Sequence, residues 1–328
     1  MIDLRGLVDW LEESVVRHSL GRPGEYARRG TDAGINPYGV ADAANILYTI
    51  GRFPRESRQR EAWVGVLQSM QDPATGLFHE STHHDYHCTA HCIAAMELFD
   101  ARPLHPLRAL HFLLAPGGLE TFLDRLDWDS PWNASHQGAG IFAALTIAEE
   151  SPLEWQDRYF AWLDEQADPE TGFFRKGHVP RGWPAGLAGV FPHLAGTFHY
   201  LFNYEAARRA IPCPQRLIDS CLSIAQQNCW PELGKSLGFA EIDWVYCITR
   251  PLRQCGHRHG ECMAALRSFA QSYGRWLTGQ DLATLPGGDD LHVLFGVICC
   301  LAELQTALPG EIRTERPLKL PLDRRPFI

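Results

Sequence analysis

A run of small and apolar residues recurs six times along this chain, at intervals of about 48 residues. The third interval is longer because it holds an insertion rich in Gly, Pro and Trp. Two connections that lie two periods apart have nearly the same sequence, DPATGLF from Asp72 and DPETGFF from Asp168. A fixed period of this size predicts a repeat architecture, in which each unit buries its apolar face against its neighbours. The six runs open at Gly39, His87, Ala134, His193, Glu241 and Asp290.

The segments between the runs are amphipathic, with apolar residues at three- and four-residue spacings that predict helices with one buried stripe. The runs themselves, such as 138–147 and 291–300, are apolar or small nearly all round, which predicts helices that are buried on every side. The chain should therefore be all-α, with six inner and six outer helices in an (α/α)6 barrel. The expected outer helices are 4–18, 57–70, 104–114, 153–166, 214–228 and 260–276.

Composition narrows the class of protein. Of the 328 residues, 45% are hydrophobic and 21% charged, as in soluble globular proteins. Six repeats without a linker favour a single domain over residues 1–308. The Pro- and Arg-rich residues 309–328 should form an extended tail, packed outside the ring or at a subunit contact of a homo-oligomer.

Charge and hydropathy exclude several kinds of partner. The formal charge of −9 argues against binding nucleic acid or an anionic membrane surface. No apolar run reaches the roughly 18 residues that a membrane span needs. The amphipathic N-terminus lacks the core of a signal peptide, so we expect a cytoplasmic protein.

The Asp-Pro-x-Thr-Gly-Leu/Phe-Phe turn, followed by an inner helix with Thr-Ala, resembles the connections of the α/α-toroid superfamily. That group holds six-hairpin glycan-active enzymes, terpenoid cyclases and protein prenyltransferase β subunits. The resemblance covers most of the chain and implies the barrel fold. The chain has no Asp-x-Asp-Asp motif and no tandem Gln-Trp repeats, and the prenyltransferase zinc ligands cannot be matched residue by residue. The resemblance therefore leaves the activity open.

In a toroid the N-termini of the inner helices meet at one mouth, where their free N–H groups favour anions. Acids, histidines and tryptophans gather at these entries, a combination that suits a polar, ring-shaped substrate. Helix capping is the alternative explanation for each single acid. A paired-carboxylate mechanism would join Asp129 with Asp243 or Glu241. The expected catalytic residues are Asp85, His87, Asp129, His136, Glu241 and Asp243, and the expected substrate contacts are Trp132, His178, Trp183, His193, Trp244, Asp290 and His292.

A metal is the alternative use of the histidines. The zincin pattern His-Glu-x-x-His occurs at His79, but it follows a turn and lacks an apolar helical flank. Zinc near His83, His87 and His91 is a looser possibility, since the last two lie one helical turn apart. The preferred interpretation is a site without a metal or other cofactor.

The leading hypothesis is an enzyme that uses Asp and His acid–base chemistry on a carbohydrate-like or other polar small molecule. The reaction would be hydrolysis, elimination or epimerisation, as in a hydrolase, lyase or isomerase. One alternative is a terpenoid-type cyclase, dehydratase or isomerase. The other is a non-catalytic helical-repeat binding module. Residues that would line the aromatic cavity of a cyclase are Phe142, Phe198, Tyr200, Phe202 and Phe295.

Overall fold

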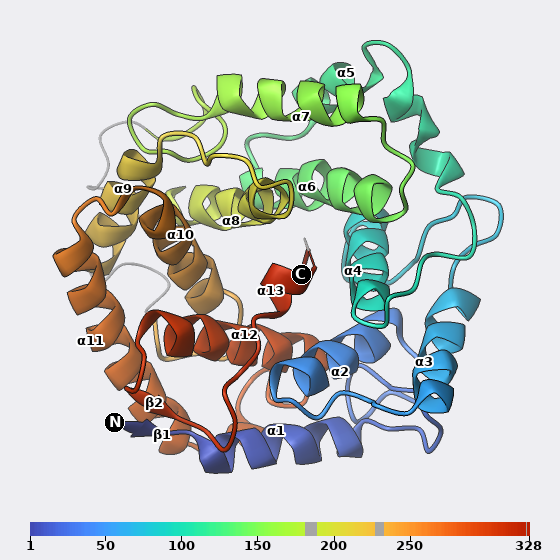
Figure 1. Ribbon diagram of the computed structural model, residues 1–328, viewed down its shortest axis with the longest axis vertical. Helices are drawn as coiled ribbons and strands as arrows, with labels where there is room; N and C mark the ends of the chain where they lie inside the picture. Colours follow the sequence, from blue (N-terminus) through green and yellow to red (C-terminus); the bar gives the residue numbers. More distant parts are fainter. Residues whose placement is uncertain (181–188, 227–232, 326) are drawn as a thin grey trace.

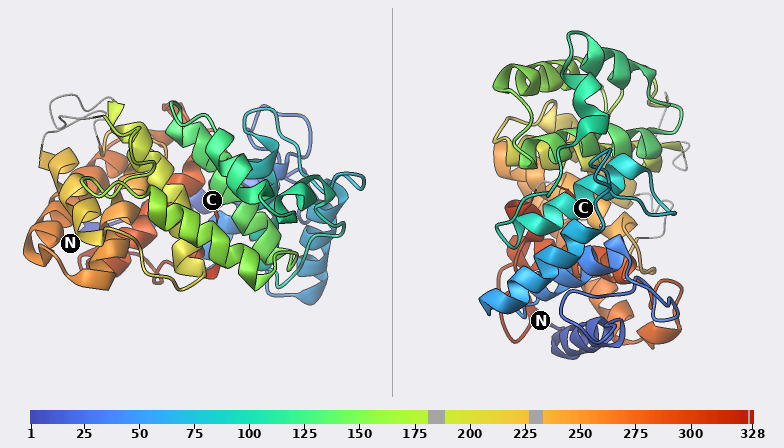
Figure 2. Two further views of the ribbon diagram at one scale, coloured as in Figure 1. Left: turned by 90° about the horizontal axis from the view of Figure 1, so that it is seen from above. Right: turned by 90° about the vertical axis from the view of Figure 1, so that its right-hand side faces the viewer.

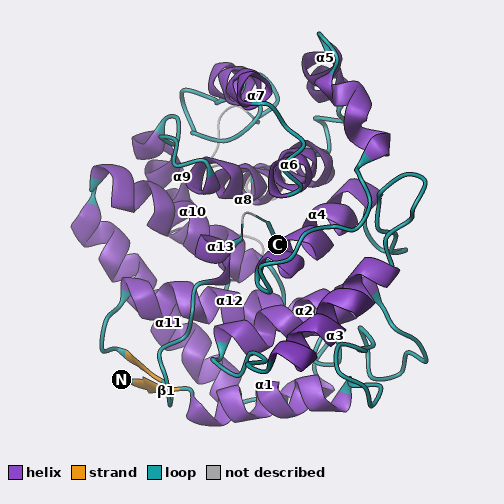
Figure 3. Cartoon of the chain, turned by 45° about the vertical axis from the view of Figure 1, so that its right-hand side comes forward, coloured by secondary structure: helices purple, strands orange, loops and turns teal. Residues whose placement is uncertain are grey.

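The computed structural model describes residues 1–180, 189–226, 233–325 and 327–328. Nearly all secondary structure in these ranges is helical, and the strands β1 (Ile2–Asp3) and β2 (Ile312–Arg313) form one parallel pair at the edge (Figure 3). The predicted all-α class is confirmed.

One helix from each repeat faces the centre of the molecule (Figure 1). Each contacts the next along the chain, and the last contacts the first. The assembly is thinner along the axis of this ring than across it (Figures 1 and 2). Because neighbours cover both flanks of these helices, they are buried nearly all round, as their sequences predict. The inner helices are α2 (Pro37–Thr49), α4 (Asp85–Glu97), α6 (Pro131–Ile147), α8 (Phe191–Ala206), α10 (Ala240–Cys255) and α12 (Leu291–Ala307).

A second layer of helices lies outside the first (Figure 1). These helices are amphipathic; α7, for example, buries Trp155, Tyr159 and Leu163, which are four residues apart. The predicted helix over 104–114 is wrong at its start: Pro106 disfavours helical geometry at His105, and a 3-10 helix forms only from Arg108. The outer elements are α1 (Arg5–Arg17), α3 (Ser57–Ser69), η1 (Arg108–Leu114), α5 (Gly118–Arg125), α7 (Leu153–Gln166), α9 (Pro214–Gln226) and α11 (His259–Thr278).

The two similar turns adopt the same hydrogen-bonded geometry. In each, the aspartate Oδ1 accepts from the two backbone N–H groups that precede the glycine. Gly76 and Gly172 then take positive φ angles of 82° and 77°. The phenylalanine that ends the motif donates its N–H to a threonine of the next inner helix, Thr89 or Thr197. The sequence repeat is therefore a repeat of the turn and of its attachment to the ring.

Small residues bring the inner helices into backbone contact. A Cβ at Gly140 of α6 would lie 2.9 Å from the carbonyl oxygen of Tyr86 in α4. One helix further round the ring, a Cβ at Gly196 of α8 would lie 2.9 Å from the carbonyl oxygen of Pro131 in α6. Because backbone cannot withdraw as a flexible side chain can, these two contacts require glycine.

The end of the chain lies inside the ring, and the expectation that the tail packs outside is wrong for its last residues. After β2 the chain forms α13 (Pro321–Arg324), which contacts α2 and α8. Arg325, Phe327 and Ile328 are then buried. The C-terminus of the chain lies at the centre of the ring (Figure 1). Arg324 pairs with Glu97 at the end of α4, so this C-terminal segment, residues 321–325 and 327–328, enters from the C-terminal ends of the inner helices.

Candidate functional site

Imidazole rings from three inner helices converge at the centre of the ring. His87 of α4, His136 of α6 and His199 of α8 are each at most 6% exposed. One nitrogen of each ring lies within 4.8 Å of one nitrogen of the other two. The ring centroids of His87 and His136 are 4.4 Å apart, and those of His136 and His199 are 4.9 Å apart. We call these residues the three-histidine site. Phe327 of the C-terminal segment packs against His87, with ring centroids 4.9 Å apart, on the side of the C-terminal ends of the inner helices.

Hydroxyl groups hold the outer nitrogens of two of these rings. Nδ1 of His87 lies 2.5 Å from the Tyr38 hydroxyl, and Nδ1 of His199 lies 3.0 Å from Ser135 Oγ. Ser135 donates its own hydrogen to the carbonyl oxygen of Trp132, so His199 must donate from Nδ1 and keep its lone pair on Nε2. His136 has no hydrogen-bond partner among the described residues. The site thus offers nitrogens that no described group uses.

Burial keeps these imidazoles neutral. Desolvation, together with the charges of neighbouring histidines, lowers the pKa of His87 and His136 well below the ordinary value. The same causes lower the pKa of His199 to about 3. The neutral imidazole is the form that binds a metal ion, and no competing proton has to leave near neutral pH.

A second group lies beside the first and has a different arrangement of hydrogens. Asp42 of α2 is fully buried, with Oδ1 2.9 Å from His91 Nε2 and Oδ2 3.1 Å from His292 Nδ1. Its ligand-type atoms also lie within 4.8 Å of one another. Burial acts to raise the pKa of Asp42, but the two imidazoles outweigh it and hold this pKa below its ordinary value. We call Asp42, His91 and His292 the Asp42 group.

The far nitrogen of His91 decides whether the Asp42 group suits a metal. His91 Nδ1 lies 3.2 Å from Nη2 of Arg325, and a guanidinium only donates hydrogen bonds. Nδ1 must therefore accept, so the hydrogen of His91 sits on Nε2 and is donated to Asp42. A nitrogen that carries a hydrogen cannot ligate a metal. The Asp42 group is a hydrogen-bonded network in which His91 is closed to metal ions.

His83 lies between the two groups, at the start of α4. Its ring centroid is 5.0 Å from that of His87 and 5.1 Å from that of His292. Its Nδ1 is 2.8 Å from Thr82 Oγ1 and 3.7 Å from Glu80 Oε2. Glu80 of the His-Glu-x-x-His pattern therefore holds His83 in place through Nδ1.

The predicted catalytic residues separate into two sets. His87 and His136 come together in the three-histidine site. Asp129 points outward, with its side chain 95% exposed and 3.5 Å from His178 Nδ1. Asp85 is also at the surface and lies 3.0 Å from His79 Nδ1. No recorded contact within the described residues joins either acid to the histidine rings.

The two acids of α10 are buried without an ion-pair partner among the described residues. Glu241 accepts from the Gly234 N–H and the Ser236 hydroxyl. One oxygen of Glu241 and one of Asp243 have no hydrogen bond in the described part of the chain. Burial raises the pKa of both carboxyls, that of Asp243 the more strongly. The paired-carboxylate hypothesis requires one of these acids to lie close to Asp129. Within the described residues no contact joins either of them to Asp129.

The predicted substrate contacts are likewise scattered. Trp132 is 45% exposed and lies 4.9 Å from His136, at the edge of the three-histidine site. His193 is buried against the carbonyl oxygen of Phe174. Asp290 caps α12 through the His292 N–H and pairs with Arg28. Trp183 lies outside the described residues.

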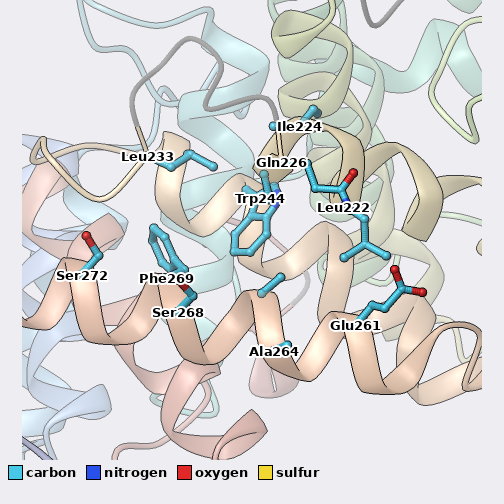
Figure 4. A pocket seen from close by; sticks show the side chains of 12 residues that line it. Leu222, Ile224, Gln226, Leu233, Trp244, Glu261, Ala264, Ser268, Phe269 and Ser272 are labelled. Atoms are coloured by element: carbon cyan, nitrogen blue, oxygen red, sulfur yellow. The ribbon is translucent and has the colours of Figure 1, made fainter.

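Trp244 faces outward and borders a different cavity. Its Nε1 donates to the carbonyl oxygen of Cys221. A pocket of about 470 Å³ lies between α9, α10 and α11, away from the histidines, with Trp244 and Phe269 among its lining (Figure 4). Its edge includes Gln226 and Leu233, the described residues on either side of 227–232.

The prediction missed several residues of the centre: Tyr38, Asp42, Ser135 and His199. A signal was present for one of them, because Asp42 lies in an otherwise small and apolar helix, where a carboxylate needs a partner. His199 lies within the aromatic run of α8 and gives no such signal.

Comparison of the chain with family models, with curated proteins and with solved structures finds no match. None of the helices in the described ranges is both long enough and apolar enough to cross a bilayer. The cytoplasmic location and the homo-oligomer stay predictions.

Proposed function

We propose that the chain is an (α/α)6 barrel of the α/α-toroid type, and that it is a metal-dependent enzyme acting on a small polar molecule. The metal would bind to His87, His136 and His199. Zinc is the ion that fits best, because it takes imidazole ligands and its catalytic sites commonly have three protein ligands and one open position. The single observation that carries the proposal is the convergence of three neutral, buried imidazoles from three different helices.

The hydrogen bonds around the rings support a ligand role. Histidines that bind a metal usually donate their other N–H to an oxygen, which fixes the tautomer and the ring orientation. Ser135 takes this position behind His199, and Tyr38 takes it behind His87 when the hydrogen of His87 is on Nδ1. The ring nitrogens that lie within 4.8 Å of one another have no hydrogen-bond partner among the described residues, so their lone pairs are available to a metal ion.

The residues around the site favour hydrolysis or a related acid–base reaction. A bound zinc ion supplies Lewis acidity at its open position. Trp132 offers an aromatic surface at the edge for the apolar face of a substrate. Phe327 packs against His87 on the side of the C-terminal ends of the inner helices, so a substrate would enter from the opposite side. This arrangement favours a small molecule or the end of a larger one.

The terpenoid alternative has less support. Two of the aromatic residues expected to line its cavity pack against outer elements: Phe142 stacks on Tyr159 of α7, and Tyr200 stacks on Trp128. Titratable imidazoles, instead of a continuous aromatic wall, surround the centre of the ring.

Metal analysis tests the proposal directly. The full chain, purified without added metal and then dialysed against zinc, should hold one zinc ion per chain. His136→Ala should lose it, and this ring has no hydrogen bond whose loss would disturb the fold. His178→Ala, which removes an exposed histidine near Asp129, should bind zinc normally. Equal zinc content in the wild type and His136→Ala would show that the metal, if any, is elsewhere. Zinc-loaded and metal-free protein compared on esters, amides, lactones and glycosides would then identify the substrate class.

A further inference from the structure

The hydrogen bonds of the Asp42 group also fix the tautomer of His292 and leave one of the two His292 ring nitrogens without a partner among the described residues. Asp42 is ionised, so it only accepts, and Nδ1 of His292 must donate to it. The lone pair of a neutral His292 is therefore on Nε2. No hydrogen bond to this Nε2 occurs within the described residues. His91, by contrast, uses both of its ring nitrogens.

His292 lies at the same end of the ring as the three-histidine site. It is in the first turn of α12, as His87 is in the first turn of α4. Its ring is 5.1 Å from that of His83, which in turn is 5.9 Å from that of His136. One imidazole therefore separates His292 from the proposed metal ligands. His292 is not part of the group of nitrogens that lie within 4.8 Å of one another at the three-histidine site, and this position suits a group that acts on a substrate held at the metal.

We propose that His292 is the acid–base residue of this site. This inference rests on the proposed function for the identity of the reacting molecule. A proton of a substrate O–H or N–H passes to His292 Nε2, and the substrate atom keeps the electron pair. The ring becomes an imidazolium, which the Asp42 carboxylate stabilises without taking the proton itself. The reverse transfer returns the proton to the leaving group or product.

The charges around His292 favour this exchange. Arg325 bonds the His91 ring, and its positive charge balances the Asp42 carboxylate from the far side of that ring. The Phe239 ring, 4.5 Å from His292 on the α10 side, carries no charge. Asp42 is the charged group that bonds the His292 ring, whereas Asp290 accepts the backbone N–H of His292, and the imidazolium and the Asp42 carboxylate together are neutral. The titratable and charged groups around His292 are Tyr38, Asp42, His83, His91 and Asp290, and behind them Arg28 and Arg325.

The chain also contains a matched internal control. His91 is also buried, 0% exposed against 5% for His292, and binds the same carboxylate, but its second nitrogen is occupied by Arg325. A purely structural role for the Asp42 group predicts that neither ring has a reactive nitrogen. An acid–base role predicts that only His292 has a reactive nitrogen.

Diethyl pyrocarbonate, which acylates the unprotonated nitrogen of an imidazole, separates these cases in the metal-free wild-type protein. Peptide mass spectrometry after brief treatment at pH 7 should find His292 modified at least tenfold faster than His91. Nitrogen NMR of histidine-labelled protein should place the hydrogen of His292 on Nδ1. Equal rates for the two rings, or a His292 hydrogen on Nε2, would overturn the inference. Neither measurement needs a variant that has to fold.

Zinc binding distinguishes failure of this inference from failure of the proposed function. His292→Asn keeps an N–H near the position of Nδ1 and removes Nε2, and it should bind zinc as tightly as the wild type. Loss of zinc in His292→Asn would make His292 a ligand and overturn the acid–base role. Absence of zinc from the wild type would refute the proposed metal, whereas the acylation and NMR results would still decide whether His292 has an open nitrogen.

Discussion

The three-histidine site and the Asp42 group contain similar side chains at similar spacing, but only one of them suits a metal. Both have three buried members whose ligand-type atoms lie within 4.8 Å of one another. In the first, hydroxyls stand behind two rings and the inner nitrogens are without partners. In the second, one carboxylate receives two N–H groups, and Arg325 closes the far side of His91. Burial and spacing do not define a metal site; the partner of the second ring nitrogen does.

The largest expected effect is acid unfolding driven by the three-histidine site. The pKa values of His87, His136 and His199 are lowered in the folded protein, whereas the unfolded chain takes up protons near pH 6.5. Below about pH 6.5 the unfolded state therefore binds more protons, and stability falls as the pH falls. The slope is about 1.4 kcal/mol per pH unit for each histidine, or about 4 kcal/mol for the three, and these residues contribute no slope above that window.

Urea unfolding in EDTA between pH 7.5 and 5 measures this slope. His136→Gln should reduce it by about 1.4 kcal/mol per pH unit, because one buried neutral imidazole is gone. If the unfolding free energy of His136→Gln has the same pH slope as that of the wild type, His136 is protonated in the folded protein. The three-histidine site would then not consist of neutral imidazoles, as its contrast with the Asp42 group requires.

The next effect concerns stability at neutral pH and should come from the Asp42 group. Asp42→Ala leaves two N–H groups without an acceptor and Arg325 without its balancing charge. Breaking a buried charged network of this kind costs about 3–5 kcal/mol. Chemical denaturation of the metal-free protein at pH 7.5 measures the loss. Asp129→Ala, at an exposed side chain, should stay within about 0.5 kcal/mol of the wild type. A small loss in Asp42→Ala would mean that this network is not the structural centre of the ring.

Local sequence patterns predicted most of the fold, because the same helix and turn patterns recur in successive repeats. The turns at Asp72 and Asp168 and the close-packed glycines, such as Gly140, are readable from the sequence alone. The C-terminal segment was not predictable in this way. Arginine is a residue type that usually lies at the surface. Burial of Arg325 involves hydrogen bonds to Asn45 and His91, which are far away in the sequence.

The centre of the site depends on ring closure, and local patterns do not report it. Asp42 and His292 are 250 residues apart and meet only because α12 returns to α2. The expectation that site residues lie at the helix starts identified His87, in the first turn of α4, and His136, in the second turn of α6. It misplaced Asp129, which precedes the first residue of α6 at Pro131 and so turns outward. Near a helix start, a shift of one residue changes the direction of the side chain by about 100°.

The smallest expected effect would show that the groups behind the rings matter to the proposed metal. Ser135→Ala removes the oxygen that receives the N–H of His199, and Tyr38→Phe removes the hydroxyl beside His87 while keeping the aromatic ring. Each change should weaken zinc affinity by about 10- to 100-fold, because the ligand ring loses its orientation and some basicity. Competition with a zinc-chelating dye measures the affinity. Ser220→Ala removes another buried serine hydroxyl, one that donates to Thr171 at a distance from the histidines, and it should leave zinc affinity unchanged. If Ser135→Ala and Ser220→Ala bind zinc equally well, the hydroxyls do not prepare the rings, and the distinction between the two clusters must rest on Arg325 alone.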